Sequence, residues 1–270
     1  MHATALHVLA PAPHEPEPFP VVLMPEPRFF VDTPLRPGAR IELPESVAHH
    51  AIRVLRLEPG SPIILFNGQG GSWSAILHIE ARRASAQLVD HDAHEVELPG
   101  RVTLVQGIPG GDKMDFVIEK ATELGATGLA PIAAQRSIVK LSGPRLEKRL
   151  QHWQRVAIAA CEQCGRNRVP GVTFPLSLAE WMHQHATAHD RVLIAHPEGG
   201  ITLNEALAEV PLQGALALLV GPEGGWSEQE LQGAIQLGAL PVRFGPRILR
   251  TETAGLALLA ASCAVLGWNG

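Results

Sequence analysis

Two rhythms of hydrophobic and polar positions divide the chain near residue 100. Between residues 28 and 98, short apolar runs are separated by turn residues, which is typical of β-strands. The glycine-rich NGQGG at 67–71 is typical of a hairpin turn. We therefore predict a small β-barrel domain over residues 28–99. The runs expected as strands are RFFV (28–31), RIEL (40–43), PIILF (62–66), SWSAILHI (72–79) and SAQLVD (85–90).

After residue 100 the pattern alternates between buried strands and amphipathic helices. The first strand, VTLVQGI, is followed by a helix over 112–125 that aligns its apolar residues on one face and ends at Gly125. Alternating strands and helices predict an α/β domain over 100–270 with a parallel sheet, and ligands bind beyond the carboxyl ends of such strands. Further strands are expected at 128–134, 191–196, 215–221 and 240–245, and a long helix at 144–165.

The segment LLVGPEGGWSEQE at 218–230 lies at one of these strand ends. Ser227 and Glu230 form a capping-box pattern, in which each side chain bonds the backbone N–H of the other. A buried strand, a glycine loop and a capped helix together leave backbone open to a ligand. AHPEGG at 195–200 repeats the pattern after another strand, which indicates either a chance match or a second loop on the same rim.

Composition is that of a globular protein. The 270 residues carry a net charge of −5, which is not the basic balance of a typical nucleic-acid binder. Residues 136–168, however, hold eight basic and two acidic residues, a net charge of +6. This stretch is either a solvated helix face or an anion-binding surface. Three cysteines and the absence of a long apolar run predict a cytoplasmic location without a membrane span.

Residues 1–27 are rich in proline and glutamate and lack the basic start of a signal peptide. We expect them to form a disordered extension. Met24 precedes the first expected strand and is a candidate start of the functional chain.

Several familiar motifs fail on spacing. GIPGGDKM at 107–114 resembles a phosphate-binding loop, but Asp112 and Met114 replace its glycine and hydroxyl residue. Cys161 and Cys164 lack the further ligands that zinc requires, and they close a helix rather than open one. We interpret them as packed, reduced thiols and predict no metal site. Of the tryptophans, Trp73, Trp153, Trp181 and Trp226 could stack on RNA bases, although core packing is the stronger expectation for most.

The C-terminal segment 245–267 predicts a closely packed helix rich in small residues, which could also form a subunit interface. Thr251 or Thr253 is a candidate cap for this helix. The preceding FGPRILRTET places Arg247, Arg250 and Glu252 beside an Ile–Leu pair. An apolar, cationic and hydroxylated loop suits an amphiphilic ligand.

Five blocks in order resemble a known family. They are HHAIRVLRLEPG, GDKMDFVIEKATELGA, AIAACEQCGRNRVP, LLVGPEGGWSEQE and FGPRILRTETA, within residues 28–268. The chain resembles the bacterial 16S rRNA (uracil(1498)-N(3))-methyltransferases of the SPOUT superfamily. The resemblance implies a PUA-like β-barrel, a parallel α/β domain with a deep trefoil knot, and a homodimer through the knot domain. It also implies S-adenosylmethionine (SAM) as cofactor, and 16S rRNA in the assembled small ribosomal subunit as substrate.

Site residues follow from the same resemblance. The cofactor would lie against three loops, comprising His196, Leu219, Val220, Gly221, Pro222, Glu223, Gly224, Gly225, Phe244, Gly245, Ile248, Leu249, Arg250 and Thr251. Because uracil N3 carries a proton, a carboxylate could act as base and a guanidinium could stabilise the anion. The candidates are Glu223, Glu252, Arg250, Arg136 and Arg166, each of which could instead be structural. Expected RNA contacts are Arg28, Arg53, Arg56, Lys120, Arg166, Asn167 and Arg168.

Two alternatives remain at this point. One is ribose 2′-O-methylation by another knotted methyltransferase. The other is a non-catalytic ribosome-assembly factor that binds RNA but not SAM. The intact GPEGG and RILRTET segments argue against the second alternative.

Overall fold

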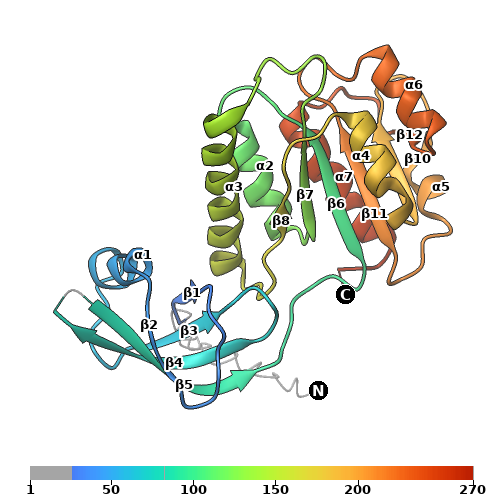
Figure 1. The fold of residues 1–270 in the computed structure, drawn as a ribbon. Helices are drawn as coiled ribbons and strands as arrows, with labels where there is room; N and C mark the ends of the chain where they lie inside the picture. The colour runs from blue at the N-terminus through green and yellow to red at the C-terminus, as the bar shows by residue number, and fades with distance from the viewer. Residues whose placement is uncertain (1–25, 82, 270) are drawn as a thin grey trace, which may run out of the picture.

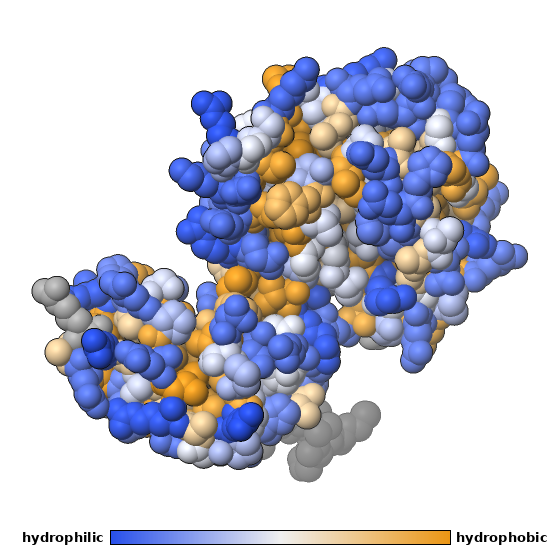
Figure 2. Space-filling model, viewed as in Figure 1, coloured by the Kyte–Doolittle hydropathy of each residue, from blue (hydrophilic) through white to orange (hydrophobic). Residues whose placement is uncertain are grey.

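The computed structural model describes residues 26–81 and 83–269, so most of the expected N-terminal extension, with Met24, lies outside the described residues. The described chain forms two lobes, each built on its own sheet (Figure 1). Figure 2 shows polar surface over much of both lobes and apolar surface where the lobes meet.

The N-terminal lobe is a five-stranded sheet in the order β1-β3-β4-β5-β2. Its strands are β1 (Arg28–Phe30), β2 (Arg40–Glu42), β3 (Pro62–Phe66), β4 (Ser72–Glu80) and β5 (Arg83–Asp92). All five expected strands are therefore confirmed, and residues 67–71 connect the antiparallel β3 and β4 as expected. The inward residues Phe29, Ile63 and Leu77 are fully buried in one core.

The hydrogen-bonded ladder does not close on itself among the described residues, because β1 and β2 each pair on one side only. The predicted small β-domain is present, with its sheet open between β1 and β2 among the described residues. Helix α1 (Glu45–His49) and a π-helical turn (His50–Val54), which the strand pattern did not predict, bury Ala48 and Ala51 in the core of this sheet. The segment therefore covers part of the apolar face of this sheet.

The C-terminal lobe is a seven-stranded sheet whose pairs are all parallel, in the order β10-β12-β9-β11-β6-β7-β8. The strands are β6 (Arg101–Gly107), β7 (Gly128–Ile132), β8 (Gly171–Val172), β9 (Arg191–Ala195), β10 (Ile201–Thr202), β11 (Ala215–Val220) and β12 (Leu240–Arg243). The five longer strands were expected, whereas the two-residue β8 and β10 are too short to show a period. The predicted parallel sheet is confirmed.

Helices cover both faces of this sheet. One face packs against α2 (Lys113–Glu123), α3 (Gly143–Cys164), α5 (Leu203–Leu207) and α7 (Thr251–Val265). The other face packs against α4 (Leu178–His185) and α6 (Glu228–Gln236), with a short 3-10 turn (Ala186–Ala188) after α4. β11 is buried at every position, because it has neighbours on both sides and helices on both faces.

Local capping determines where several helices begin and end. The capping box of Ser227 and Glu230 is present as predicted, with both reciprocal bonds near 3 Å. Gly125 and Gly165 follow α2 and α3 with φ of 92° and 87°, a conformation that glycine adopts readily. A second capping box, of Ser177 and Glu180, starts α4, which we did not predict although its sequence signal was present. No helix in the described part of the chain is long and apolar enough to span a bilayer.

The fold generates a first prediction, which concerns the central strand. Leu218 is fully buried in β11. Leu218→Ala therefore removes packing contacts and leaves a cavity, because the neighbouring strands and helices hold the surrounding atoms in place. We expect a loss of about 2–5 kcal/mol in the free energy of unfolding, measured by denaturant titration. Leu212→Ala, at a side chain 59% exposed, is the matched control and should change stability little. Equal effects of the two substitutions would contradict the assigned core.

Candidate functional site

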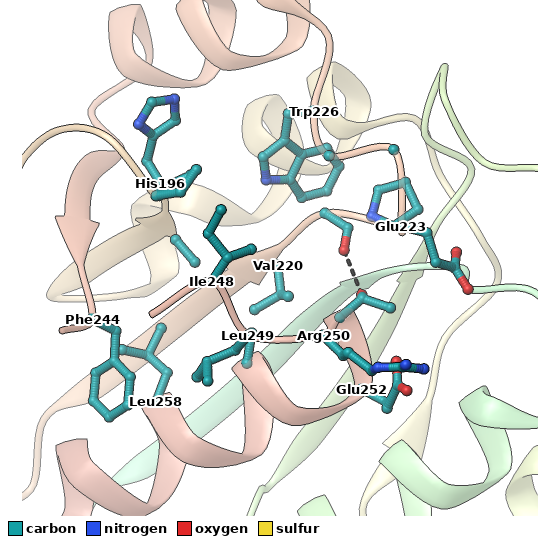
Figure 3. A pocket seen from close by; sticks show the side chains of 18 of the residues that line it. His196, Val220, Glu223, Trp226, Phe244, Ile248, Leu249, Arg250, Glu252 and Leu258 are labelled. Atoms are coloured by element: carbon teal, nitrogen blue, oxygen red, sulfur yellow. Dashed lines mark hydrogen bonds between the residues drawn. The ribbon is translucent and has the colours of Figure 1, made fainter. Parts of the chain in front are cut away.

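A cavity of about 730 Å³ lies at the carboxyl end of the parallel sheet. Its walls come from the ends of β9, β11 and β12, the loops that follow them, and the start of α7 (Figure 3). Small-molecule sites usually measure about 300–1,000 Å³. In an open parallel sheet they often lie where the connections that follow two neighbouring strands go to opposite sides of the sheet. In this sheet the chain leaves β6 toward β7 and β8, whereas β11 and β9 lie on the other side of β6. The change of direction falls between β6 and β11, and the cavity lies on the β11 side of it.

The structure brings nearly all of the expected cofactor residues to this cavity. Those that line it are His196, Val220, Gly221, Pro222, Glu223, Gly224, Gly225, Phe244, Gly245, Ile248, Leu249, Arg250 and Thr251. Leu219 is the exception, because its fully buried side chain packs in the core on the α4 and α6 face of the sheet. Alternate residues of a strand point to opposite faces, so Val220 and not Leu219 faces the cavity.

A buried threonine joins the loops around the cavity. The Thr251 hydroxyl donates to the carbonyl oxygen of Gly221 at 2.5 Å, the bond drawn dashed in Figure 3. The same hydroxyl accepts a bond of 2.8 Å from the amide of Gln106, which is buried at the end of β6. Thr251 is the first residue of α7, and Arg250 occupies the cap position without a side-chain cap bond, so the predicted threonine cap is wrong. The hydroxyl instead connects β6, the glycine loop and α7.

The glycines of the loop are required by the loop itself. A Cβ on Gly221 would lie 3.0 Å from backbone atoms of Gly225 and Trp226, and Gly225 has a φ of 67°. A Cβ on Gly107, at the end of β6, would lie 2.5 Å from the ring of Pro222. We predicted that these glycines leave room for a ligand, and the geometry shows first that they let the turn pack on β6.

Several charged residues that were proposed for catalysis lie toward one end of the cavity, and large apolar side chains lie toward the other. In Figure 3, Glu223, Arg250 and Glu252 lie on one side, and Phe244, Ile248 and Leu258 lie toward the other. Four of the five candidates for catalysis, namely Glu223, Arg250, Glu252 and Arg136, line the same cavity. The fifth, Arg166, does not line it, because it is buried where the two lobes meet. The sequence alone placed these candidates up to 116 positions apart, between Arg136 and Glu252.

The two carboxylates differ in their partners. Glu223 accepts bonds from the Lys113 ammonium at 2.8 Å and from the backbone N–H of Gly110 at 3.0 Å. Partial burial opposes its charge, but the bonds from Lys113 and the backbone prevail and lower the pKa of Glu223. Glu252 Oε2 lies 3.6 Å from Lys113 Nζ and accepts no hydrogen bond within the described part of the chain. Glu252 is thus the less engaged carboxylate.

Several residues that line the cavity were not predicted as site residues, and Lys113 and Trp226 are two of them. Lys113 starts α2, in a segment that we predicted as a helix without assigning it a site residue. Its bond to Glu223 raises the pKa of Lys113. Trp226 is 9% exposed, and its indole N–H has no partner among the described residues. Its position directly after the glycine loop was the available signal. Arg136 donates to the carbonyl of Gly224 at 3.1 Å and so lies over the same loop.

The expected RNA-binding residues do not form one surface. Arg53 and Arg56 are exposed beside the π-helical turn, and Arg168 is exposed beside Glu95. Lys120 is half-buried and pairs with Glu119 and Glu123. Arg166 and Asn167 are only 3% exposed, and Arg28 contacts both of them, so these three lie at the contact between the lobes. Their burial leaves Arg166 and Asn167 no surface for RNA in this structure, and we withdraw both as proposed contacts.

The cysteines are free thiols. Burial raises the pKa of the Cys161 thiol to about 12 and that of Cys263 to about 11. Among residues 26–81 and 83–269, no group of three His, Cys, Asp or Glu side chains is arranged to hold a metal ion.

Comparisons with known proteins identify the class. A family model described as an RNA methyltransferase domain matches residues 96–262, and a second, described as an RNA methyltransferase PUA domain, matches residues 43–89. The chain is 34% identical to the ribosomal RNA small subunit methyltransferase E of Synechocystis sp., over 84% of this chain and 74% of that protein. It is also 34% identical to the protein of the same name from Bacillus subtilis, over 79% and 85% respectively.

Solved structures agree with this class. The Neisseria gonorrhoeae ribosomal RNA small subunit methyltransferase E, bound to S-adenosyl methionine, matches with a TM-score of 0.80 and 39% identity, covering 89% of this chain and 98% of that one. A Legionella pneumophila methyltransferase in complex with the bound cofactor SAM matches with a TM-score of 0.84 and 31% identity over the same shares. The chain therefore belongs to the ribosomal RNA small subunit methyltransferase E family of RNA methyltransferases.

The packing of the glycine loop generates a second prediction. Gly107→Ala should displace Pro222 and the loop from β6, with a loss of about 1–3 kcal/mol in the free energy of unfolding. Gly171→Ala is the control, because no atom lies within 4 Å of the added Cβ. Thermal unfolding of both variants measures the difference. A Gly107→Ala protein as stable as the control would contradict the tight contact.

The thiols generate a third prediction. At pH 8 a thiol with a pKa of about 12 is ionised to roughly one part in ten thousand, so Cys161 should resist Ellman's reagent in the folded protein. We expect one rapidly reacting thiol, the partly exposed Cys164, and three after denaturation. Cys164→Ser should abolish the rapid reaction. Rapid reaction of all three thiols in the folded protein would contradict the assigned burial.

Proposed function

We propose that this chain transfers a methyl group from SAM to N3 of one specific uridine of 16S rRNA, the position that the resembled family numbers 1498, in the assembled small ribosomal subunit. Family membership and the names of the relatives support the rRNA substrate. The observation that carries the proposal is one cavity with Phe244, Ile248 and Leu258 toward one end and Glu223, Arg250 and Glu252 toward the other. This arrangement suits an amphiphilic cofactor beside a base that must lose a proton.

The cavity residues fit SAM. When bound, SAM supplies an electrophilic methyl group on a sulfonium. Val220, Leu249 and Leu258 offer apolar contact, and the unpartnered indole N–H of Trp226 is a donor for a polar atom of a ligand. The carboxylates of Glu223 and Glu252 favour a cationic group at the charged end of the cavity. An exposed Ile248, 86% accessible, gains burial when a ligand or a second protein surface covers it.

Within the proposed reaction, Glu252 is the group that we assign to receive the uracil N3 proton. Glu223 already accepts two close hydrogen bonds, whereas Glu252 Oε2 accepts none. The Arg250 guanidinium stabilises the negative charge that develops on the uracil oxygens once N3 loses its proton, and Arg136 stays a second candidate for this role. Lys113 holds Glu223 ionised and in place at 2.8 Å and lies farther, at 3.6 Å, from Glu252, the carboxylate that we assign to turn to the substrate.

Substrate binding involves both lobes in this proposal. Arg53 and Arg56 of the N-terminal lobe, with Lys120 and Arg168, are assigned to rRNA phosphates. Exposed basic residues at the start of α3 and in the loop before it are further candidates for phosphate contacts: Lys140, Arg145 and Lys148. Phosphate contacts of this kind position the protein, and base contacts in the cavity select the nucleotide.

The remaining features of the family enter as proposals. We assign the loops at the carboxyl edge to a trefoil knot, which the family resemblance supports and periodicity cannot show. We also propose a homodimer through the C-terminal lobe, supported by the exposed Phe244, Ile248 and Val265 near and along α7. The cytoplasm, where ribosomal subunits are found, is the proposed location.

The fourth prediction tests the reaction. The full chain is incubated with labelled SAM and undermethylated small subunits, and nucleosides from the product are identified by mass spectrometry. N3-methyluridine at a single 16S position is the expected product. A 2′-O-methylated nucleoside would replace the proposed target, and failure to bind SAM or form any product would favour an assembly factor.

The same assay separates the two carboxylates. We expect Glu252→Gln to lower kcat by about 10²–10⁴-fold, because the amide cannot accept the proton, while the Kd for SAM changes little. Glu223→Gln, the matched substitution, should lower kcat less, because its role is to fix Lys113 and the loop. A larger effect on kcat from Glu223→Gln than from Glu252→Gln would contradict the assignment.

A further inference from the structure

The block CEQCGRN, which the proposed chemistry leaves without a role, lies where the two lobes meet. We define the junction segment as Glu162–Arg168, the end of α3 and the turn after it. The segment contacts β1, the turn between β3 and β4, and the linker between the two sheets. Figure 1 shows the lower end of α3 directed at the N-terminal lobe beside β1.

Arg166 makes the most extensive of these contacts. Its Nε donates to Oε1 of Glu97 at 3.0 Å, and its Nη2 donates to Oε2 at 2.5 Å, a bidentate pair. Its Nη1 donates to the carbonyl oxygens of Thr122 at 2.9 Å and Ala126 at 2.8 Å, at the carbonyl end of α2. Glu97 belongs to the covalent linker between β5 and β6, so Arg166 fastens that linker to α2.

Asn167 continues the contact toward the N-terminal sheet. Its Oδ1 accepts from Arg28 of β1 at 2.6 Å, and its Nδ2 donates to the carbonyl of His94 in the linker at 2.9 Å. One turn earlier, the Glu162 carboxylate accepts the backbone N–H of Phe30 in β1 at 2.9 Å. Side chains of the junction segment thus bond both β1 and the linker.

The turn between β3 and β4 packs against the same segment. Gly68 and Gln69 form backbone bridges with Arg168. A Cβ on Gly70 would lie only 2.4 Å from Nη2 of Arg168, and Glu95 accepts the N–H of Gly71 at 2.8 Å. The N-terminal lobe is therefore held at three places: β1, this turn and the linker.

Helix α2 connects this contact to the cavity. Its carbonyl end receives Arg166, and its first residue, Lys113, pairs with Glu223 and lies near Glu252. An 11-residue helix is about 16 Å long, so one rigid element spans from the junction to the charged end of the cavity. If the angle between the lobes changes, RNA bound by Arg53 and Arg56 of the N-terminal lobe shifts relative to the charged end of the cavity.

We propose that Arg166, with Asn167 and Glu97, is a positioning group for the rRNA substrate: it fixes the orientation of the N-terminal lobe so that bound rRNA presents its target nucleotide to the cavity. This inference rests on the proposed function. It assigns Arg166 no contact with RNA, SAM or the reacting atoms. We predict that removing the Arg166 side chain widens the range of orientations between the lobes and raises the KM for small subunits, while the Kd for SAM stays the same.

The prediction for the junction uses Arg166→Ala, Arg166→Lys and Asn167→Ala, with Arg191→Ala as control. Arg191 also pairs with a glutamate, Glu209, at 2.6 Å, but at the amino end of β9, away from the junction. A ketone-bearing amino acid is placed at Val89 and at Leu212, which are 58% and 59% exposed, and each is spin-labelled without altering the cysteines. The distance between the two labels reports the orientation of the lobes. The same variants are assayed for the SAM Kd, for the KM of small subunits and for kcat.

We expect Arg166→Ala to broaden the distance distribution and raise the subunit KM at least about tenfold, with the SAM Kd within about twofold of the parent. Arg166→Lys should be intermediate, because lysine keeps the charge and loses the bidentate pair. Asn167→Ala carries the same test if Arg166→Ala does not fold. An unchanged distance distribution and subunit KM would overturn the inference. Because the distances are measured without substrate, they test the junction even if the methylated base is not uridine.

Discussion

The candidate site depends on the hydrogen bonds of one buried hydroxyl. Thr251 bonds the carbonyl of Gly221 and the amide of Gln106, which brings together α7, the loop after β11 and the end of β6. These segments are separated by up to 145 positions in the chain. Each bond is modest alone, but a buried group left without its partner is costly, so the network favours a single arrangement of the loops. The position of the carboxylates and of the apolar wall follows from this arrangement.

A second constraint acts through α2. Burying a guanidinium is unfavourable unless its donors are satisfied. Arg166 meets this condition through Glu97, the carbonyl of Thr122 in the last turn of α2 and the carbonyl of Ala126 just after that helix. A cation at the carbonyl end of a helix also interacts favourably with the helix dipole. The other end of α2 carries Lys113, whose bond to Glu223 fixes the glycine loop from the charged side. Lobe orientation and cavity geometry therefore share one helix.

Much of the fold could be predicted from the sequence, because long elements carry a clear period or cap. Strands such as 62–66 and 215–221, and the capping box of Ser227 and Glu230, are confirmed. The two-residue β8 and β10 are too short for a period. The strand order places β11 between β9 and β6, and this depends on long-range packing that no local pattern contains.

The candidate site was predictable in its segments and less so in its individual residues. GPEGG and RILRTET do line one cavity, as expected. The pleat of β11 decides that Val220 and not Leu219 faces it, and register cannot be read from an all-apolar strand. Arg166 is a residue type that often contacts RNA phosphates. Here its side chain is buried and bonded to Glu97, so we assign it to the contact between the lobes instead. Trp226 and Lys113 could not be predicted as site residues, because they reach the cavity only through the packing of segments that are far apart in the sequence.

The central claim is that the cavity bounded by the glycine loop and the start of α7 holds SAM. A crystal structure of the full chain with SAM tests it most directly. The account predicts the adenosyl part against Val220 and Leu249, with a polar atom of SAM within hydrogen-bond distance of the Trp226 indole N–H and the methyl group directed to the Glu252 side. SAM bound elsewhere, for example in the second cavity beside His189 and Arg191, would contradict it.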